Sequence, residues 1–126
     1  MAMEAQKENG KRILVVEDDQ DVRKMIALVL KVEGHLVTEA RHGVEALNLF
    51  APGQFDLVLT DFQMPEMNGA QLIEKLRVLA PDQRIGIVSA NVHRLGETLA
   101  KVNFHLDKPF IIDDLRQSVK RALELG

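Results

Sequence analysis

Runs of apolar residues along the chain alternate between two spacings, and the alternation predicts five strands that are each followed by a helix. The predicted strands are short runs of apolar and β-branched residues, and most of them end at polar groups. They cover residues 13–16, 35–40, 56–61, 85–89 and 104–107. The third run contains few polar residues, which is typical of a strand buried on both faces of a parallel sheet.

After each strand, apolar residues recur at spacings of three and four, which predicts amphipathic helices. We expect these helices at residues 22–30, 44–50, 72–79, 92–102 and 112–123. Gly34 and Pro81 are placed to end the first and the third of them. Gly96 lies inside the fourth and counts against it, because glycine costs about 1 kcal/mol in a helix interior.

The strict alternation predicts an α/β fold with helices on both faces of a parallel sheet. A chain of 126 residues is most simply one domain, and it can bury a core without disulfides or a structural metal. We assign this domain to residues 11–126. Residues 1–10 are mostly polar and lack the apolar middle of a signal peptide, so we interpret them as a flexible tail.

The composition narrows the function classes. There is no cysteine, so disulfides and thiolate metal sites are excluded. The net charge of −3 gives no basic footprint for nucleic acid, and no apolar run approaches the length of a membrane span. We therefore expect a cytoplasmic protein without direct binding to nucleic acid or membrane. His35, His42 and His93 show no metal-ligand spacing and are expected at the surface.

Polar residues follow four of the five predicted strands. Glu17 and Asp18 follow the first, Asp61 ends the third, Ser89 ends the fourth, and Lys108 follows the fifth. Parallel strands place their C-terminal ends at one edge of the sheet, where open α/β sheets hold their ligands. Each residue alone could be a helix cap or a solvated side chain. If these residues had no shared role, four of the five strands would have to end in polar groups by chance, which is improbable.

The carboxylates in this group need a positive partner. At about 4 Å and an effective dielectric of about 20, each pair of like charges costs about 4 kcal/mol. Either one acid takes up a proton or a cation lies among them. Oxygen ligands without histidine or cysteine favour a hard cation, Mg²⁺ before Ca²⁺, and a carboxylate facing it could attack phosphorus. The adjacent Asp19 is expected to cap the first helix instead.

Four motifs stand out as a set: residues 13–19 (ILVVEDD), residues 61–69 (DFQMPEMNG), Ser89-Ala90, and residues 108–110 (KPF). Together they resemble the receiver domain of bacterial two-component response regulators, over about residues 11–125. The resemblance implies a doubly wound, flavodoxin-like (βα)5 fold with strand order 2-1-3-4-5. It also implies a phosphorylation-dependent switch that is no conventional enzyme but phosphorylates and dephosphorylates itself.

The resemblance further implies a chemical role for each group at the sheet edge. Asp61 is expected to be the phosphoacceptor, and Lys108 to bind the phosphoryl group. Mg²⁺ (or Mn²⁺) is expected to be held by Asp18, Asp61 and the backbone carbonyl of Gln63. Glu17 is expected to help hold the metal through water.

The resemblance also implies a conformational switch made of two residues, Ser89 and His105. Ser89 is expected to reorient toward the phosphoryl group, and small Ala90 to leave room for access. The second switch residue lies three positions before the lysine. The family usually has Tyr or Phe there, whereas this chain has His105, whose planar ring can still form a hydrogen bond. The resemblance implies a cis peptide bond between Lys108 and Pro109.

The implied partners are a sensor histidine kinase or a phosphotransfer protein as donor, and a downstream protein or a missing output domain as target. A phosphorylation-linked homodimer is compatible with the resemblance. Two alternatives stay open. One is an interaction module that works without phosphorylation, which the altered His105 position favours. The other is an aspartate-nucleophile phosphohydrolase, which is disfavoured because Gln63 stands where that class has its second acid.

Overall fold

Five strands form one sheet in which every recorded ladder is parallel. The computed structural model describes residues 10–90 and 95–124. The spatial order is β2-β1-β3-β4-β5. The strands are β1 (Arg12–Val16), β2 (Leu36–Ala40), β3 (Leu57–Asp61), β4 (Ile85–Ser89) and β5 (Phe104–Asp107). The predicted fold class and strand order are confirmed.

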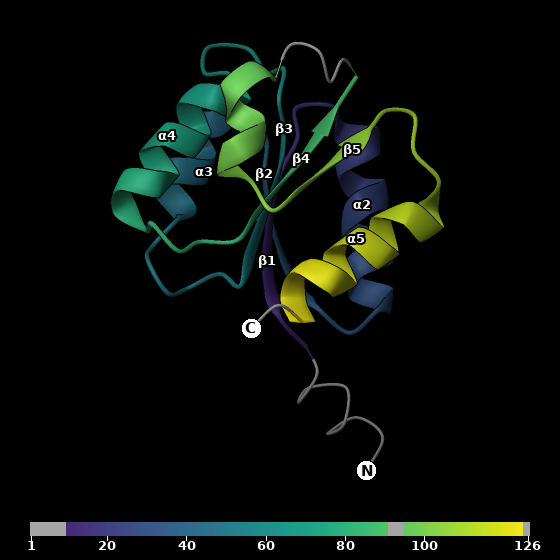
Figure 1. Cartoon of the computed structure of the whole chain (residues 1–126). Coiled ribbons are helices and arrows are strands. Elements are labelled where there is room, and N and C mark those ends of the chain that lie inside the picture. The colour runs from purple at the N-terminus through teal and green to yellow at the C-terminus, as the bar shows by residue number, and fades with distance from the viewer. Residues whose placement is uncertain (1–9, 91–94, 125–126) are drawn as a thin grey trace.

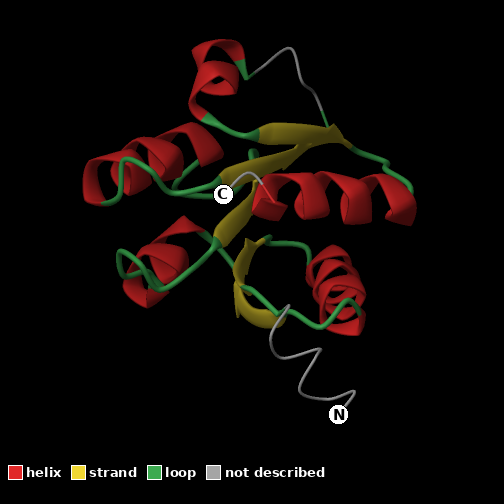
Figure 2. Cartoon of the chain, turned by 60° about the horizontal axis from the view of Figure 1, so that its bottom comes forward, coloured by secondary structure: helices red, strands yellow, loops and turns green. Residues whose placement is uncertain are grey.

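Helices cover both faces of the sheet (Figures 1 and 2). One face packs against α2 (Gln20–Val32) and α5 (Ile112–Glu124). The other face packs against α3 (Gly43–Leu49), α4 (Gly69–Leu79) and the residues around the short 3-10 helix η2 (Gly96–Lys101). Among the helices of the described ranges, none combines the length and the apolar character that a membrane crossing requires.

The central strand β1 shows how one short run serves two cores. Ile13 and Val15 pack with α2 and α5, whereas Leu14 and Val16 pack with α3 and α4. All four side chains are almost completely buried. Neighbouring β3 is buried along its whole length, as predicted from its apolar run. Continuous apolar sequence is therefore required in these strands because neither face meets solvent.

Side-chain caps set where two of the helices begin. Asp19 accepts a hydrogen bond from the Val22 backbone N–H over 3.1 Å, which confirms its predicted role as the N-cap of α2. His42 does the same for α3, because its Nδ1 accepts from the Glu45 N–H over 3.1 Å. His42 is therefore a half-buried residue that caps a helix, and its expected surface position is only partly right.

The helix predicted at residues 92–102 is wrong over the part that the structure describes. There the chain forms only the six-residue 3-10 helix η2, which begins at Gly96. Gly96 has a φ of +51°, which lies outside the right-handed helical region and interrupts an α-helix. Residues 91–94, including His93 and the start of that predicted helix, lie outside the described ranges, as do residues 1–9 of the predicted tail.

Candidate functional site

The C-terminal ends of the strands bring the predicted polar residues to one edge of the sheet. Glu17 and Asp18 directly follow β1, and Asp61 ends β3 beside it. Each of these three acids offers a carboxylate oxygen, and the three oxygens lie within 4.8 Å of one another. Glu17 and Asp61 are buried, whereas Asp18 is exposed. The cluster therefore has one side open to solvent.

Lys108 brings a positive charge from the end of β5. Its Nζ lies 2.7 Å from Glu17 Oε1 and 3.4 Å from Asp61 Oδ2. Its backbone N–H donates to the Ser89 carbonyl over 2.8 Å, which ties the turn after β5 to the end of β4. The peptide bond between Lys108 and Pro109 is cis, as the family resemblance implied. The ammonium thus lies between the two buried acids.

Glu17 is held by three further contacts. Its backbone N–H donates to the Ala40 carbonyl over 3.0 Å, and its Oε2 accepts from the Asp19 N–H over 3.1 Å. Its carbonyl accepts from Arg23 Nη1 over 2.9 Å. Sequence reasoning missed Arg23. One signal was present, because Arg23 is three residues before Ile26 and so lies on the buried face of the helix.

Burial controls the protonation of these groups. It raises the pKa of Glu17 from its usual 4.5 to about 7, although the hydrogen bond from Lys108 acts in the opposite direction. Burial also raises the pKa of Asp61, against the charge of Lys108. Burial alone would lower the pKa of Lys108, but its hydrogen bond to Glu17 and the charges of both acids outweigh burial and raise it. Because the two acids interact, the protonation of one affects the protonation of the other.

Substitution of Glu17 by Gln is expected to remove a pH dependence from the metal-free protein. A folded pKa near 7 stabilises the protein below pH 4.5, and this stabilisation is lost as the pH rises toward 7. Glu17→Gln carries no such proton, so its stability relative to wild type should increase across this window by on the order of 2 kcal/mol. Urea unfolding in EDTA at pH 5, 6, 7 and 8 measures the difference.

His35 is also a titratable group, but it is present in both wild type and Glu17→Gln, so its contribution cancels in that comparison. Burial lowers its pKa, and its own effect on stability therefore runs in the opposite direction. A difference between Glu17→Gln and wild type that stays constant from pH 5 to pH 8 would show that Glu17 is ionised throughout.

The two residues that are expected to form the switch lie on the last two strands. Ser89 is buried at the end of β4. His105 is exposed and pairs with Ile87 in the β4–β5 ladder. Gln63 is exposed just beyond β3, and its backbone N–H donates a hydrogen bond to the Asp61 carboxylate, which opposes the rise in the pKa of Asp61 that burial causes. The edge therefore brings together Glu17, Asp18, Asp61, Ser89 and Lys108, with His105 directed to solvent one strand away.

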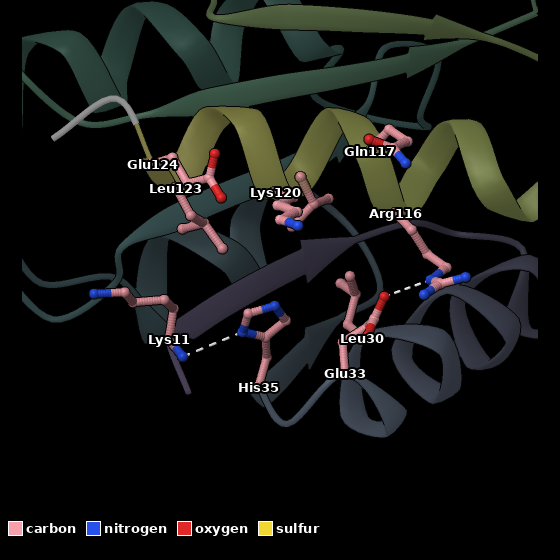
Figure 3. A pocket seen from close by; sticks show the side chains of 10 residues that line it. Lys11, Leu30, Glu33, His35, Arg116, Gln117, Lys120, Leu123 and Glu124 are labelled. Carbon is pink, nitrogen blue, oxygen red and sulfur yellow. Dashed lines mark hydrogen bonds and ion pairs between the residues drawn. The ribbon is translucent and has the colours of Figure 1, made fainter. Parts of the chain in front are cut away.

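A cavity lies away from this edge, between α2, α5 and the start of β1 (Figure 3). Its volume is about 450 Å³, and Lys11 and His35 at the opposite edge of the sheet line it. His35 is half-buried there, and its Nδ1 accepts a hydrogen bond from the Lys11 N–H over 3.2 Å. Its expected surface position is only partly right. Arg116 of α5 pairs with Glu33 across the same cavity.

A five-stranded parallel sheet in this order, with an acidic cluster and a lysine at its C-terminal edge, defines the class of receiver-like α/β domains. The family model described as the response regulator receiver domain matches residues 13–120. The chain therefore belongs to the receiver domains of two-component response regulators, and its function is phosphorylation-dependent signalling.

The chain covers nearly the whole length of some relatives and only part of the length of others. Sporulation initiation phosphotransferase F of Bacillus subtilis is 30% identical over 92% of this chain and 96% of its own length. The response regulator receiver protein CpdR of Brucella abortus is 34% identical over 90% of this chain and 97% of its own length. In contrast, the chain spans 25% of the regulatory protein AtoC of Escherichia coli and 50% of the response regulator MprA of Mycobacterium.

Solved structures show the same fold. The response regulator TrrA of Thermotoga maritima, in complex with Mg²⁺-BeF, is 33% identical and matches with a TM-score of 0.83 over 90% of this chain and 99% of its own. The non-phosphorylated HemR receiver domain of Leptospira biflexa is 28% identical, with a TM-score of 0.85 over 92% of this chain and 96% of its own. Receiver domains of this family interact with histidine kinases and phosphotransfer proteins.

Proposed function

We propose that Asp61 accepts a phosphoryl group from a histidine kinase, a phosphotransfer protein or a small acyl phosphate. The supporting observation is the cluster of Glu17, Asp18 and Asp61 oxygens within 4.8 Å of one another, with Lys108 Nζ 3.4 Å from Asp61 Oδ2. An Asp61 oxygen forms the new bond to phosphorus. The P–N bond of a phosphohistidine, or the P–O bond of an acyl phosphate, breaks, and the donor keeps its electron pair.

The acids fit a divalent cation. The cluster consists of three carboxylates without histidine or cysteine, and one of them is exposed, so a hard cation that keeps water ligands suits it. We propose Mg²⁺ (or Mn²⁺), held by Asp18, Asp61 and the Gln63 carbonyl, with Glu17 acting through water. When bound, this cation neutralises charge on the transferring phosphoryl oxygens.

Lys108 and Ser89 serve the phosphorylated state in this proposal. The Lys108 ammonium is already within reach of Asp61, so it can bind a phosphoryl oxygen there. Ser89 ends the neighbouring strand and its hydroxyl can donate to another oxygen. His105 takes the second switch position, and a downstream protein or an output domain reads the change. A phosphorylation-linked homodimer and a cytoplasmic location are further proposals that rest on the family alone.

The proposal is tested by incubating the protein with a small acyl phosphate and Mg²⁺ and measuring its intact mass. A gain of one phosphoryl group is expected with Mg²⁺, and no gain in EDTA, because three clustered carboxylates repel an incoming phosphate. An unchanged mass with Mg²⁺ and donor would contradict the proposal. It would favour the interaction module, for which a partner pull-down is equal with and without donor.

Gln63 argues against the hydrolase alternative. An aspartate-nucleophile phosphohydrolase needs a general acid two residues after its nucleophile, and an amide cannot supply a proton in that role. Steady release of phosphate from a phosphate monoester, with many turnovers for each protein molecule, is the result that would restore this alternative.

A further inference from the structure

Arg23 is a buried charge that the chemistry described above does not use. It lies on the inner face of α2 with only 7% of its surface exposed. Its Nη1 donates to the Glu17 carbonyl over 2.9 Å, and its Nε donates to Glu39 Oε1 over 3.1 Å. A buried guanidinium is costly unless its hydrogen bonds are satisfied and its charge is paired. Both conditions are met by these two partners, which come from different parts of the chain.

Glu39 anchors this arginine from β2. Burial alone would raise the pKa of Glu39, but hydrogen bonds from Lys24 and Arg23 outweigh burial and hold the pKa below its usual value. The side chain of Glu39 is 19% exposed, and Lys24 Nζ lies 3.1 Å from the same oxygen that Arg23 contacts. Glu39 is therefore ionised at neutral pH and fixes one end of the guanidinium.

The other end of the guanidinium acts on the peptide group between Glu17 and Asp18. The carbonyl of Glu17 and the N–H of Asp18 belong to one rigid plane. Holding that carbonyl therefore sets the direction in which the chain leaves β1. The N–H of Glu17 is fixed separately by the Ala40 carbonyl. These contacts together determine where the carboxylates of Glu17 and Asp18 lie relative to Asp61.

We propose that Arg23, anchored by Glu39, is a positioning residue for the metal site. It does not contact the clustered carboxylates but acts through the Glu17 carbonyl, keeping Glu17 and Asp18 within ligand distance of Asp61. The proposal rests on the proposed function, because it assumes that this cluster holds Mg²⁺. Groups that orient metal ligands commonly change metal affinity about 10- to 100-fold when they are removed.

The sign of the effect separates positioning from simple electrostatics. Arg23→Met removes a positive charge close to the acids, and by Coulomb's law alone this change strengthens the binding of a cation. Positioning predicts the opposite, because the freed peptide group lets the acids move apart. We expect Arg23→Met to weaken Mg²⁺ binding about 10-fold, measured by calorimetry on the unphosphorylated protein.

Two matched variants control for charge and for packing. Lys24→Met removes a neighbouring charge that also contacts Glu39 but does not reach Glu17. Arg116→Met removes an arginine that ties the end of α2 to α5 through Glu33, far from the cluster. Both should keep the wild-type Mg²⁺ affinity or bind slightly tighter. Glu39→Gln should weaken it, and Arg23→Lys should fall between wild type and Arg23→Met, because lysine lacks the planar fork.

A second readout separates affinity from chemistry. The Mg²⁺ concentration for half-maximal phosphorylation by a small acyl phosphate should rise about 10-fold in Arg23→Met. The maximal rate at saturating Mg²⁺ should stay within about two-fold of wild type, since the acceptor and Lys108 are unchanged. A purely structural role for Arg23 lowers the melting temperature but leaves the Mg²⁺ affinity of the folded protein unchanged.

The outcomes are distinguishable. Wild-type Mg²⁺ affinity in folded Arg23→Met overturns the positioning role while leaving the proposed function intact. If Arg23→Met does not fold, then unchanged affinity in both Glu39→Gln and Arg23→Lys overturns it. A wild-type protein that neither binds Mg²⁺ nor gains a phosphoryl group overturns the proposed function, and the positioning role with it.

Discussion

Asp61→Asn is expected to abolish the phosphoryl mass gain and, at the same time, to stabilise the metal-free protein. The amide has no anionic oxygen with which to attack phosphorus, so the loss should be complete. Burial raises the pKa of Asp61, which means that ionising this carboxyl inside the fold opposes stability. The neutral amide removes that cost at pH values above the raised pKa, and Lys108 keeps its 2.7 Å contact to Glu17.

The opposite directions of the two effects make the result decisive. A variant that fails to react because it has unfolded cannot also have a higher urea midpoint in EDTA. Asp56→Asn is the matched control, because Asp56 lies before β3, at the other end of that strand. It should gain the phosphoryl group as wild type does. An equal mass gain in Asp61→Asn and wild type would exclude Asp61 as the acceptor.

Gly69→Ala is expected to destabilise the fold by about 1–3 kcal/mol, the usual cost of overpacking, and to slow phosphorylation. Gly69 begins α4 and its N–H donates to the Phe62 carbonyl over 2.7 Å. A Cβ at this position would lie 2.8 Å from Phe62 Cα and 3.0 Å from the Asp61 carbonyl oxygen. Both atoms belong to the backbone, so the strand end that carries Asp61 has to move.

Gly43→Ala provides the comparison for this substitution. Gly43 also begins a helix, α3, but a Cβ there would meet the Met67 side chain, with Sδ at 2.9 Å. A methionine side chain can change rotamer, so the expected cost is below about 1 kcal/mol. Urea unfolding and the rate of phosphoryl mass gain should separate the two variants. Equal effects on the rate would contradict the view that Gly69 restrains Asp61 through its backbone.

The fold was readable from the sequence because strands buried on both faces demand apolar residues at every position. Residues 13–16 of β1 and 57–59 of β3 satisfy that demand, and the polar groups that follow these residues had to lie at one edge of a parallel sheet. The helix expected at residues 92–102 was not readable in the same way. Its apolar spacing was correct, but the left-handed backbone of Gly96 overrides it.

The site was only partly readable because its finest contacts join distant segments. Lys108 and Glu17 are 91 residues apart, and the pattern of strand ends does not tell that the ammonium lies closer to Glu17 than to Asp61. Arg23 reaches Glu39 across 16 residues. A charged residue on the buried face of a helix indicates that another residue inside the protein pairs with it. Which residue this is depends on how α2 packs on β2, and the sequence pattern does not show that packing.

The Lys108 ammonium acts in the metal-free protein as a counter-ion that the chain itself supplies. The occupancy of this site by a dissolved cation would depend on the salt concentration of the buffer. The Lys108 ammonium is instead tethered to the end of β5, so its local concentration is the same in any buffer. A divalent ion held by Glu17, as proposed above, would compete with this ammonium for the Glu17 carboxylate. The affinity of the proposed metal site would then depend on an exchange between a tethered cation and a dissolved one.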